Sequence, residues 1–248
     1  MAGMRAIKVK RGNRTTAFSD EQYDAVITVI KSQFPSEIKN LEDQKQHDDA
    51  HRLLSLMELM RWGGLALEDA VRFKLNSMKD NGEVTYHRVK TGNRAEPTLL
   101  PHVVTLLKAT VPVDGDLNQP FYDKNVKVST NKNRWSTKLK DVFTDAGIDL
   151  VKTDIREREP HSHMLRDTFA VAQLRTQYEL NQIDHQGIAD ALGDTVEVFL
   201  KHYAPQIEEL KQAKRNAQRR IVEVQAKAWA EKNSQQGNKV ASIAEGRK

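Results

Sequence analysis

The sequence predicts a mainly helical α+β fold with a small antiparallel β-sheet and a C-terminal helix. Apolar residues recur at helical spacing through most of the 248 residues. Two turn signals, Asn81-Gly82 and Thr91-Gly92-Asn93, separate short alternating segments that contain Val, Thr and Tyr. A long basic stretch follows Pro205. These features divide the chain into a basic arm (1–16), a main domain (17–204), and a basic C-terminal helix with a disordered tail (205–248).

The first helices are marked by their end signals. Ser19, with Gln22 three residues later, forms a capping box that begins a helix ending at about Gln33. A polar stretch, Glu42–Asp49, leads into an apolar helix, His51–Trp62, which Gly63-Gly64 ends. Further helices are predicted at Leu65–Leu75, Val103–Ala109, Val128–Ala146, Ser162–Arg175 and Gln186–Leu192.

The predicted sheet surrounds the two turns. Phe73–Met78 and Glu83–Lys90 flank the first turn, and Pro97–Leu100 follows the second. After the sheet and the helices, Pro205 is expected to begin a long helix that runs to about Lys232. From Gln206 to Lys232 there are seven Lys and Arg residues against four Glu, a net charge of +3. The spacing of Ile207, Leu210, Ile221 and Val224 gives this helix an apolar stripe.

Composition limits the possible functions. The net charge of +5 suits an anionic partner such as nucleic acid, because Lys and Arg contacts to phosphates release counterions. The chain has no cysteine, which excludes disulfides, thiolate metal sites and cysteine nucleophiles. The start, Met1 to Arg14, lacks the apolar core of a signal peptide, and no apolar run approaches the roughly 18 residues of a membrane helix. We therefore expect a cytoplasmic, nucleoid-associated protein with no membrane partner.

The strongest chemical signal is the pair His163 and Arg166. Three residues apart on a helix, they share one face. An arginine offers a fixed fork of donors to a phosphate oxygen, and a histidine adds a titratable donor. By itself this spacing is also typical of a solvated helix face. A metal site built on His161 and His163 is disfavoured, because no third ligand lies at a convincing spacing.

The surrounding motifs resemble those of the tyrosine recombinases, or phage integrases. Ser162–Ala170 (SHMLRDTFA), then Ala191–Asp194 (ALGD), then Lys201–Pro205 (KHYAP) are similar to the family pattern H-x-L-R-[HD]-T-F-A, L-G-H and a later tyrosine. Upstream, Arg88–Gly92 resembles the hairpin that carries the family's lysine, and Gly64–Val71 resembles its G-L-R-x-x-[ED] box. The resemblance covers roughly residues 17–205.

This resemblance implies an integrase-type catalytic domain that cuts and rejoins double-stranded DNA. Tyr203 would attack phosphorus and form a covalent 3′-phosphotyrosine, without a metal, ATP or other cofactor. Arg166 and a second arginine would bind the non-bridging oxygens, His163 would add a hydrogen bond or handle the nucleophile's proton, and Lys90 would protonate the leaving 5′-oxygen. Family members assemble as dimers or tetramers on DNA, so self-association is expected. The C-terminal helix would dock on a neighbouring protomer or fold back on its own domain.

Two positions depart from the family pattern. Ala66 stands where the first arginine is expected, so Arg61, across the Gly63-Gly64 turn, is the candidate replacement. Arg72 is a weaker candidate. Asp194 stands where the family has histidine; it could orient a neighbouring side chain, and His202 could supply the missing donor. Loss of one preorganised donor typically costs about 10²–10³ in rate.

Several alternatives remain open at this point. The basic residues Lys132, Arg134 and Lys138 could follow a DNA backbone or form a solvated helix face. Ala66 and Asp194 are compatible with a catalytically impaired DNA-binding regulator, and a type IB topoisomerase would use similar chemistry. Only about 16 residues precede the first helix, so we expect a chain without the family's DNA-clamping domain, through truncation or by nature.

Overall fold

The computed structural model describes residues 16–148, 151–152 and 157–245. Helix α1 spans Asp20–Ser32 and begins with the predicted capping box: the Ser19 hydroxyl accepts from the Gln22 backbone, and the Gln22 side chain accepts from the Ser19 N–H. Two donors that a helix start otherwise leaves unpaired are satisfied in this way. The predicted first helix is confirmed.

Helix α2 is longer than the sequence predicted, because it spans Leu41–Gly63 without a break. Asn40 caps it, accepting from the backbone N–H groups of Glu42 and Asp43, so the polar stretch forms its first turns. Gly64 ends it in the left-handed conformation at φ +67°, and a Cβ there would lie 2.5 Å from the Phe169 ring. The predicted break at this turn is confirmed.

The segment after this turn forms less regular structure than predicted. Helix α3 covers only Leu67–Val71, and a 3₁₀ turn, η1, follows at Leu75–Ser77. The strand predicted at Phe73–Met78 is therefore wrong except at its end, where Met78 forms an antiparallel bridge with Val84 across the first turn. Its backbone turns to another partner, since the Leu75 N–H donates to the Asn118 carbonyl at 2.9 Å.

The small antiparallel sheet is confirmed, in a shorter form. Strand β1 (Tyr86–His87) pairs with β2 (Arg94–Ala95) across the predicted second turn, where Gly92 has φ +72°. Isolated bridges extend the sheet toward Val84 and Thr98. A second pair, β3 (Val151–Lys152) with β4 (Glu157–Arg158), was not predicted.

Four further helices lie close to their predicted positions. They are α4 (Pro101–Lys108), α5 (Val128–Asp145), α6 (His163–Leu180) and α7 (His185–Leu192). Helix α6 runs five residues beyond its predicted end at Arg175, and Asn181 ends it in the left-handed conformation. Gly193 ends α7 in the same conformation, as expected.

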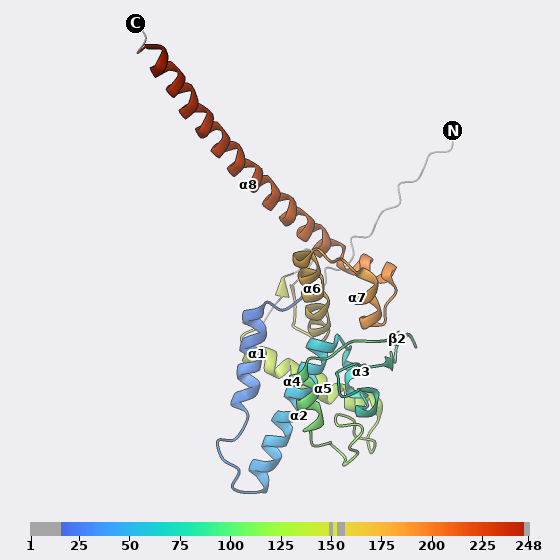
Figure 1. Ribbon diagram of the computed structural model, residues 1–248. Coiled ribbons are helices and arrows are strands. Elements are labelled where there is room, and N and C mark those ends of the chain that lie inside the picture. The colour runs from blue at the N-terminus through green and yellow to red at the C-terminus, as the bar shows by residue number, and fades with distance from the viewer. Residues whose placement is uncertain (1–15, 149–150, 153–156, 246–248) are drawn as a thin grey trace, which may run out of the picture. The chain divides into compact units, whose positions relative to one another are not determined.

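Helix α2 lies at the centre of residues 16–204 and contacts α1, α3, α4, α5 and α6 (Figure 1). Its side chains Leu56, Met57, Leu59 and Met60 are fully buried. Because this apolar helix touches so many others, it fixes the relative positions of the Gly63-Gly64 turn and the start of α6, which both border the site described below.

Helix α8 begins earlier than predicted and spans Val196–Glu245. The Thr195 hydroxyl accepts from the Val198 N–H and starts the helix ten residues before Pro205. Pro205 thus lies inside a helix, and the tail predicted to lack structure continues as helix to Glu245. The contacts within the chain divide it at Ala204–Pro205 into two compact units. None of the described helices is both long enough and apolar enough to cross a membrane. The N-terminal arm, apart from Thr16, lies outside the described residues.

Candidate active site

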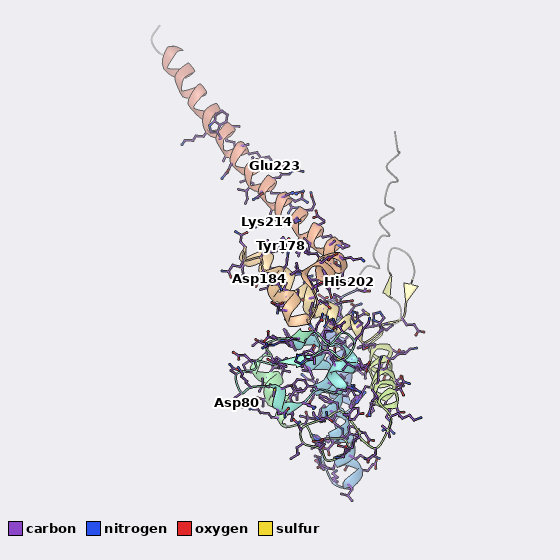
Figure 2. All side chains as sticks on the ribbon, turned by 90° about the vertical axis from the view of Figure 1, so that its right-hand side faces the viewer. Asp80, Tyr178, Asp184, His202, Lys214 and Glu223 are labelled. Atoms are coloured by element: carbon purple, nitrogen blue, oxygen red, sulfur yellow. The ribbon has the colours of Figure 1, made fainter. Side chains whose placement is uncertain are left out.

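A pocket of about 260 Å³ gathers side chains from three distant parts of the sequence. The hairpin after β1, the first turns of α6, and the α7–α8 junction each contribute. The lining residues are Arg88, Lys90, Thr91, His163, Arg166, Asp167, Asp194, Val198, His202 and Tyr203. His202 and Tyr203 adjoin on α8, and His202 is labelled in Figure 2. The pocket therefore combines a tyrosine hydroxyl, several basic side chains and two carboxylates.

Arg166 is one of the most deeply buried side chains, with 2% of its surface exposed. Its Nη1 donates to the Gly64 carbonyl at 2.7 Å, and its Nη2 donates to the Leu192 carbonyl at 2.9 Å and to Asp194 Oδ2 at 2.8 Å. These acceptors fix the plane of the guanidinium group. The Gly63-Gly64 turn and the end of α7 thus act as supports for this arginine.

Arg88 is also buried, with 8% of its surface exposed, although it lies on a hairpin. Its Nη1 donates to Asp194 Oδ1, and its Nε lies 3.7 Å from Asp69 Oδ2. The other oxygen of Asp69 accepts from the Val89 N–H at 2.7 Å and holds the hairpin backbone. Burial raises the pKa of Asp69, while the Val89 hydrogen bond and the charge of Arg88 act in the opposite direction.

Tyr203 lies in the second turn of α8 with only 3% of its surface exposed. Its ring packs 5.0 Å from the ring of Phe199, centroid to centroid, and its hydroxyl donates to Asp167 Oδ1 at 3.0 Å. Burial, together with the negative charge of Asp167, raises the pKa of the Tyr203 hydroxyl. The phenol is therefore neutral in this arrangement and needs a proton acceptor before it can act as a nucleophile.

Asp167 and His163 have pKa values shifted in opposite directions. Burial raises the pKa of Asp167 to about 7, against the opposing hydrogen bond from Tyr203 and the charge of Arg166. Partial loss of hydration and the positive charge of Arg166 lower the pKa of His163 to about 4, although 55% of its side chain is exposed to solvent. Its Nε2 lies 3.7 Å from Asp167 Oδ1. At neutral pH the imidazole is thus uncharged, and Asp167 is the group that titrates.

The structure brings together six of the side chains that the sequence pointed to: Lys90, His163, Arg166, Asp194, His202 and Tyr203. Arg61 does not line the pocket. Its guanidinium lies 4.4 Å from the Trp62 ring centroid and 5.5 Å from that of Tyr23. Arg72 lines a neighbouring hollow with Asp69 and Tyr86.

The basic residues on α5 are each paired with an acid. Lys132 lies 3.5 Å from Glu68, Arg134 lies 3.3 Å from Asp123, and Lys138 lies 3.7 Å from Asp49. These ion pairs reduce the positive potential that this helix presents to a DNA backbone.

Two pocket residues, Arg88 and Asp167, were missed by sequence reasoning. Arg88 directly follows β1 and Lys90 lies in the hairpin turn, so no strand alternation in the sequence indicated that both line the pocket. Asp167 stands four residues after His163 on α6, which places both on one face. Within the part of the chain that the structure describes, no cluster of three or more His, Asp or Glu side chains could hold a metal ion.

Solved structures show the same arrangement of elements. The crystal structure of XerA recombinase matches with a TM-score of 0.56 and 15% identity, over 84% of this chain and 66% of that one. The XerH site-specific recombinase bound to palindromic difH substrate, in a post-cleavage complex, matches with a TM-score of 0.58 and 16% identity, over 84% and 55%. This chain has the tyrosine recombinase fold.

The same fold is found in a lambda integrase dimer bound to a COC′ core site, with a TM-score of 0.50 and 16% identity over 77% of this chain and 60% of that one. The expected integrase-type catalytic fold is thereby confirmed. The chain spans 55–66% of the length of these three recombinase chains. No protein-family model and no curated protein sequence matches the chain.

Proposed function

We propose that the chain is a site-specific DNA strand transferase that cuts and rejoins DNA through a covalent 3′-phosphotyrosine. The observation that carries this proposal is the pocket in which the buried Tyr203 hydroxyl lies among Arg88, Lys90, His163 and Arg166. A phosphodiester is a poor electrophile, so a protein that attacks it must supply positive charge where negative charge accumulates. The recombinase fold supports this assignment.

In the proposed reaction, the Tyr203 oxygen forms a bond to phosphorus while the bond between phosphorus and the 5′-oxygen breaks. Arg166 stabilises the charge on the non-bridging oxygens, and neutral His163 donates a hydrogen bond to one of them. The leaving 5′-oxygen takes a proton from Lys90, so that it departs as a hydroxyl. Because the phosphotyrosine ester retains the energy of the cut bond, attack by another 5′-hydroxyl rejoins the strand without ATP.

The proton of Tyr203 passes to Asp167 in this proposal. The two oxygens are already hydrogen-bonded at 3.0 Å, which is within direct transfer distance. A carboxyl whose pKa is near neutrality can both accept this proton and return it when the ester is resolved. His163 is the less suitable acceptor, because its pKa lies several units lower.

The test is formation of a covalent adduct on a library of nicked duplexes with a randomised target region. A nick beside the scissile phosphate lets the short fragment that carries the new 5′-hydroxyl diffuse away. The strand cannot then be rejoined, so the adduct accumulates. We expect protein-linked DNA that survives denaturation, is lost in Tyr203→Phe and is retained in Tyr178→Phe. Tyr178 is a matched control, because it is a buried tyrosine on α6 outside the pocket (labelled in Figure 2). Absence of an adduct from every duplex contradicts the proposal.

The alternative is a DNA-binding regulator without catalytic activity, and a specific observation favours it. Asp194 neutralises part of the charge of Arg88 and Arg166, and Asp167 binds the nucleophile's proton. Under this alternative the chain retards duplex DNA on a gel but forms no adduct. If an adduct forms, exchange between two sites would separate a recombinase from a relaxing enzyme of the topoisomerase IB type.

We also propose that double-stranded DNA assembles copies of the chain through the unit 205–248. This unit is a single helix, so it has no second element with which to bury Ile221, Val224 and Trp229. A lambda integrase of the same fold is a dimer on its core site. Replacing Ile221 and Val224 by Glu should weaken self-association on DNA in sedimentation, whereas Gln218→Glu should not. Unchanged assembly of the double variant contradicts this role.

A further inference from the structure

We propose that Arg88 is the second phosphate-binding arginine of the pocket, and that Asp194 positions Arg88 and Arg166 side by side. This proposal deepens the proposed function, on which it rests, because it assigns a residue for the scissile phosphate. The sequence motifs indicated that Asp194 could orient a neighbouring side chain, but they did not indicate Arg88 as a phosphate ligand.

The carboxylate of Asp194 bridges the guanidinium groups of Arg88 and Arg166. Its Oδ1 accepts from Arg88 Nη1, and its Oδ2 accepts from Arg166 Nη2 at 2.8 Å. Since one carboxylate spans both groups, the two guanidinium ions are neighbours and line the same pocket. Without the shared anion, two like charges this close would repel each other strongly in a buried setting.

Arg88 is held at its aliphatic stem and at Nη1, while its Nε is paired with Asp69 by charge without a hydrogen bond. A Cβ on Gly193 would lie 2.8 Å from Arg88 Cδ and 3.0 Å from its Cγ, so the bare glycine leaves room for the aliphatic stem. The Gly193 carbonyl lies 3.5 Å from Nη1, and Asp69 lies beside Nε. Burying an arginine is costly unless it is paired, and here two carboxylates and a carbonyl pair with it.

Arg88 supplies both the positive charge and the free N–H donors that a second phosphate oxygen needs. In-line attack on a phosphodiester builds negative charge on two non-bridging oxygens, and a guanidinium is suited to each of them. Arginine has five N–H donors, and the contacts of Arg88 described above use only some of them. Arg88, Arg166 and Lys90 carry three positive charges against the two negative charges of Asp69 and Asp194, which leaves a net charge of +1 while Asp167 is protonated.

Asp69 accounts for the alanine at position 66. Ala66 has no donor, yet Asp69, three residues later in the same box, holds the hairpin that carries Arg88. The box thus contributes an arginine indirectly, by anchoring one from another segment. Arg61 is the competing candidate, and its guanidinium packs between the rings of Tyr23 and Trp62 instead.

The first test measures phosphate binding at individual arginine side chains by NMR and does not depend on catalysis. The full chain, labelled with ¹⁵N-arginine, is titrated with inorganic phosphate, and the Nε–Hε signals are assigned by single Arg→Lys variants. We expect the signals of Arg88 and Arg166 to shift together with one dissociation constant. The signals of Arg61 and of Arg52, a partly buried arginine paired with Asp49 away from the pocket, should not move. An unmoved Arg88 signal, or a shift at Arg61 in its place, overturns the proposal.

The second test uses the cleavage reaction. Arg88→Met should slow adduct formation on an ordinary duplex by on the order of 10²–10³-fold. On a duplex whose scissile phosphate carries a neutral methylphosphonate, the same variant should lose less than about tenfold, because one charged oxygen is gone. An equal loss on both duplexes would indicate a structural role and overturn the proposal.

Arg88→Lys is the control for the possibility that Arg88→Met does not fold, because lysine keeps the positive charge that faces Asp69 and Asp194. It should retain the wild-type melting temperature within a few degrees and still lose at least about tenfold in cleavage, since lysine lacks the fork. Wild-type cleavage by Arg88→Lys overturns the proposal. If phosphate shifts the Arg88 signal but wild-type chain forms no adduct on any duplex, the arginine pair stands and the recombinase function fails.

Discussion

Two buried arginines, Arg88 and Arg61, lie in very different surroundings within the same unit. Arg88 meets carboxylates, a carbonyl and the wall of an open pocket. Arg61 lies against the faces of two aromatic rings at the end of α2. The Nε atoms of both arginines are buried without a hydrogen-bond partner. Loss of hydration lowers the pKa of Arg61. Both guanidinium groups are buried cations, but Arg88 lines the pocket that also holds Tyr203, and Arg61 does not.

This difference leads us to expect different roles for the two arginines. Carboxylates fix the plane of a guanidinium and leave its other donors aimed at a ligand. Aromatic rings stabilise the cation through their faces without defining which donors point outward. We therefore expect changes near Arg88 to alter chemistry, and changes near Arg61 to alter stability alone.

The largest expected effect is on cleavage by the two arginine variants. Arg88→Met should reduce the single-turnover rate of adduct formation by on the order of 10²–10³-fold, because a preorganised donor is lost. Arg61→Met should stay within about threefold of the wild type once the folded fraction is taken into account. A slow Arg61→Met beside a normal Arg88→Met would reverse the comparison.

The second expected effect is on stability at Asp194. Asp194→Ala leaves Arg88 and Arg166 buried without their shared anion, so the free energy of unfolding should fall by about 3 kcal/mol in urea titrations. Asp80→Ala, which removes the exposed partner of the half-exposed Lys108, is the control and should leave the free energy of unfolding almost unchanged. Equal losses would mean that the Asp194 bridge is no stronger than a surface pair.

The third expected effect is a pH dependence of the cleavage rate that arises from Asp167 in the pocket and not from groups near Arg61. Asp167 must be ionised to accept the Tyr203 proton, and its pKa is about 7. Below that pH the ionised fraction, and with it the cleavage rate, should rise about tenfold per pH unit. Asp167→Asn should be slow and should lack this limb. Near Arg61, burial raises the pKa of Tyr23 further from neutrality, so Tyr23→Phe should leave the profile unchanged.

The smallest expected effect is at Trp62. Trp62→Leu removes the ring that lies 4.4 Å from the Arg61 guanidinium. The loss of this cation–π contact should lower the free energy of unfolding by about 1 kcal/mol, apart from any packing change. Cleavage by the folded variant should equal that of the wild type. A large fall in the cleavage rate would show that the position of Arg61 affects the chemistry of the pocket.

Local signals in the sequence were enough for most of the fold. The capping box at Ser19, the turn at Gly64 and the end of α7 at Gly193 each depend on neighbouring residues only, and each was predicted. The irregular segment after α3 was not predicted, because its backbone pairs with Asn118, more than 40 residues away. Pro205 was read as a helix start, since the Thr195 cap was overlooked.

The same limit applies to the site. Tyr203, His163 and Arg166 lie in compact motifs, so the sequence pointed to them. Arg88 pairs with a residue 106 positions away, and no local pattern reports such a contact. Arg61 was chosen because it lies near Ala66 along the chain. Proximity in sequence did not place its side chain in the pocket, because the rings of Tyr23 and Trp62 hold it elsewhere.

Pro205 has a consequence for the motions of the nucleophile. A proline inside a helix has no N–H to donate to the carbonyl four residues earlier, here that of Lys201, so the helical ladder is interrupted just after Tyr203. Fraying that begins at the distal end of α8 therefore meets a weak point before it reaches the phenol. In amide hydrogen exchange, protection should change abruptly at residue 205, so that the tail opens and closes many times while the turn bearing Tyr203 stays folded.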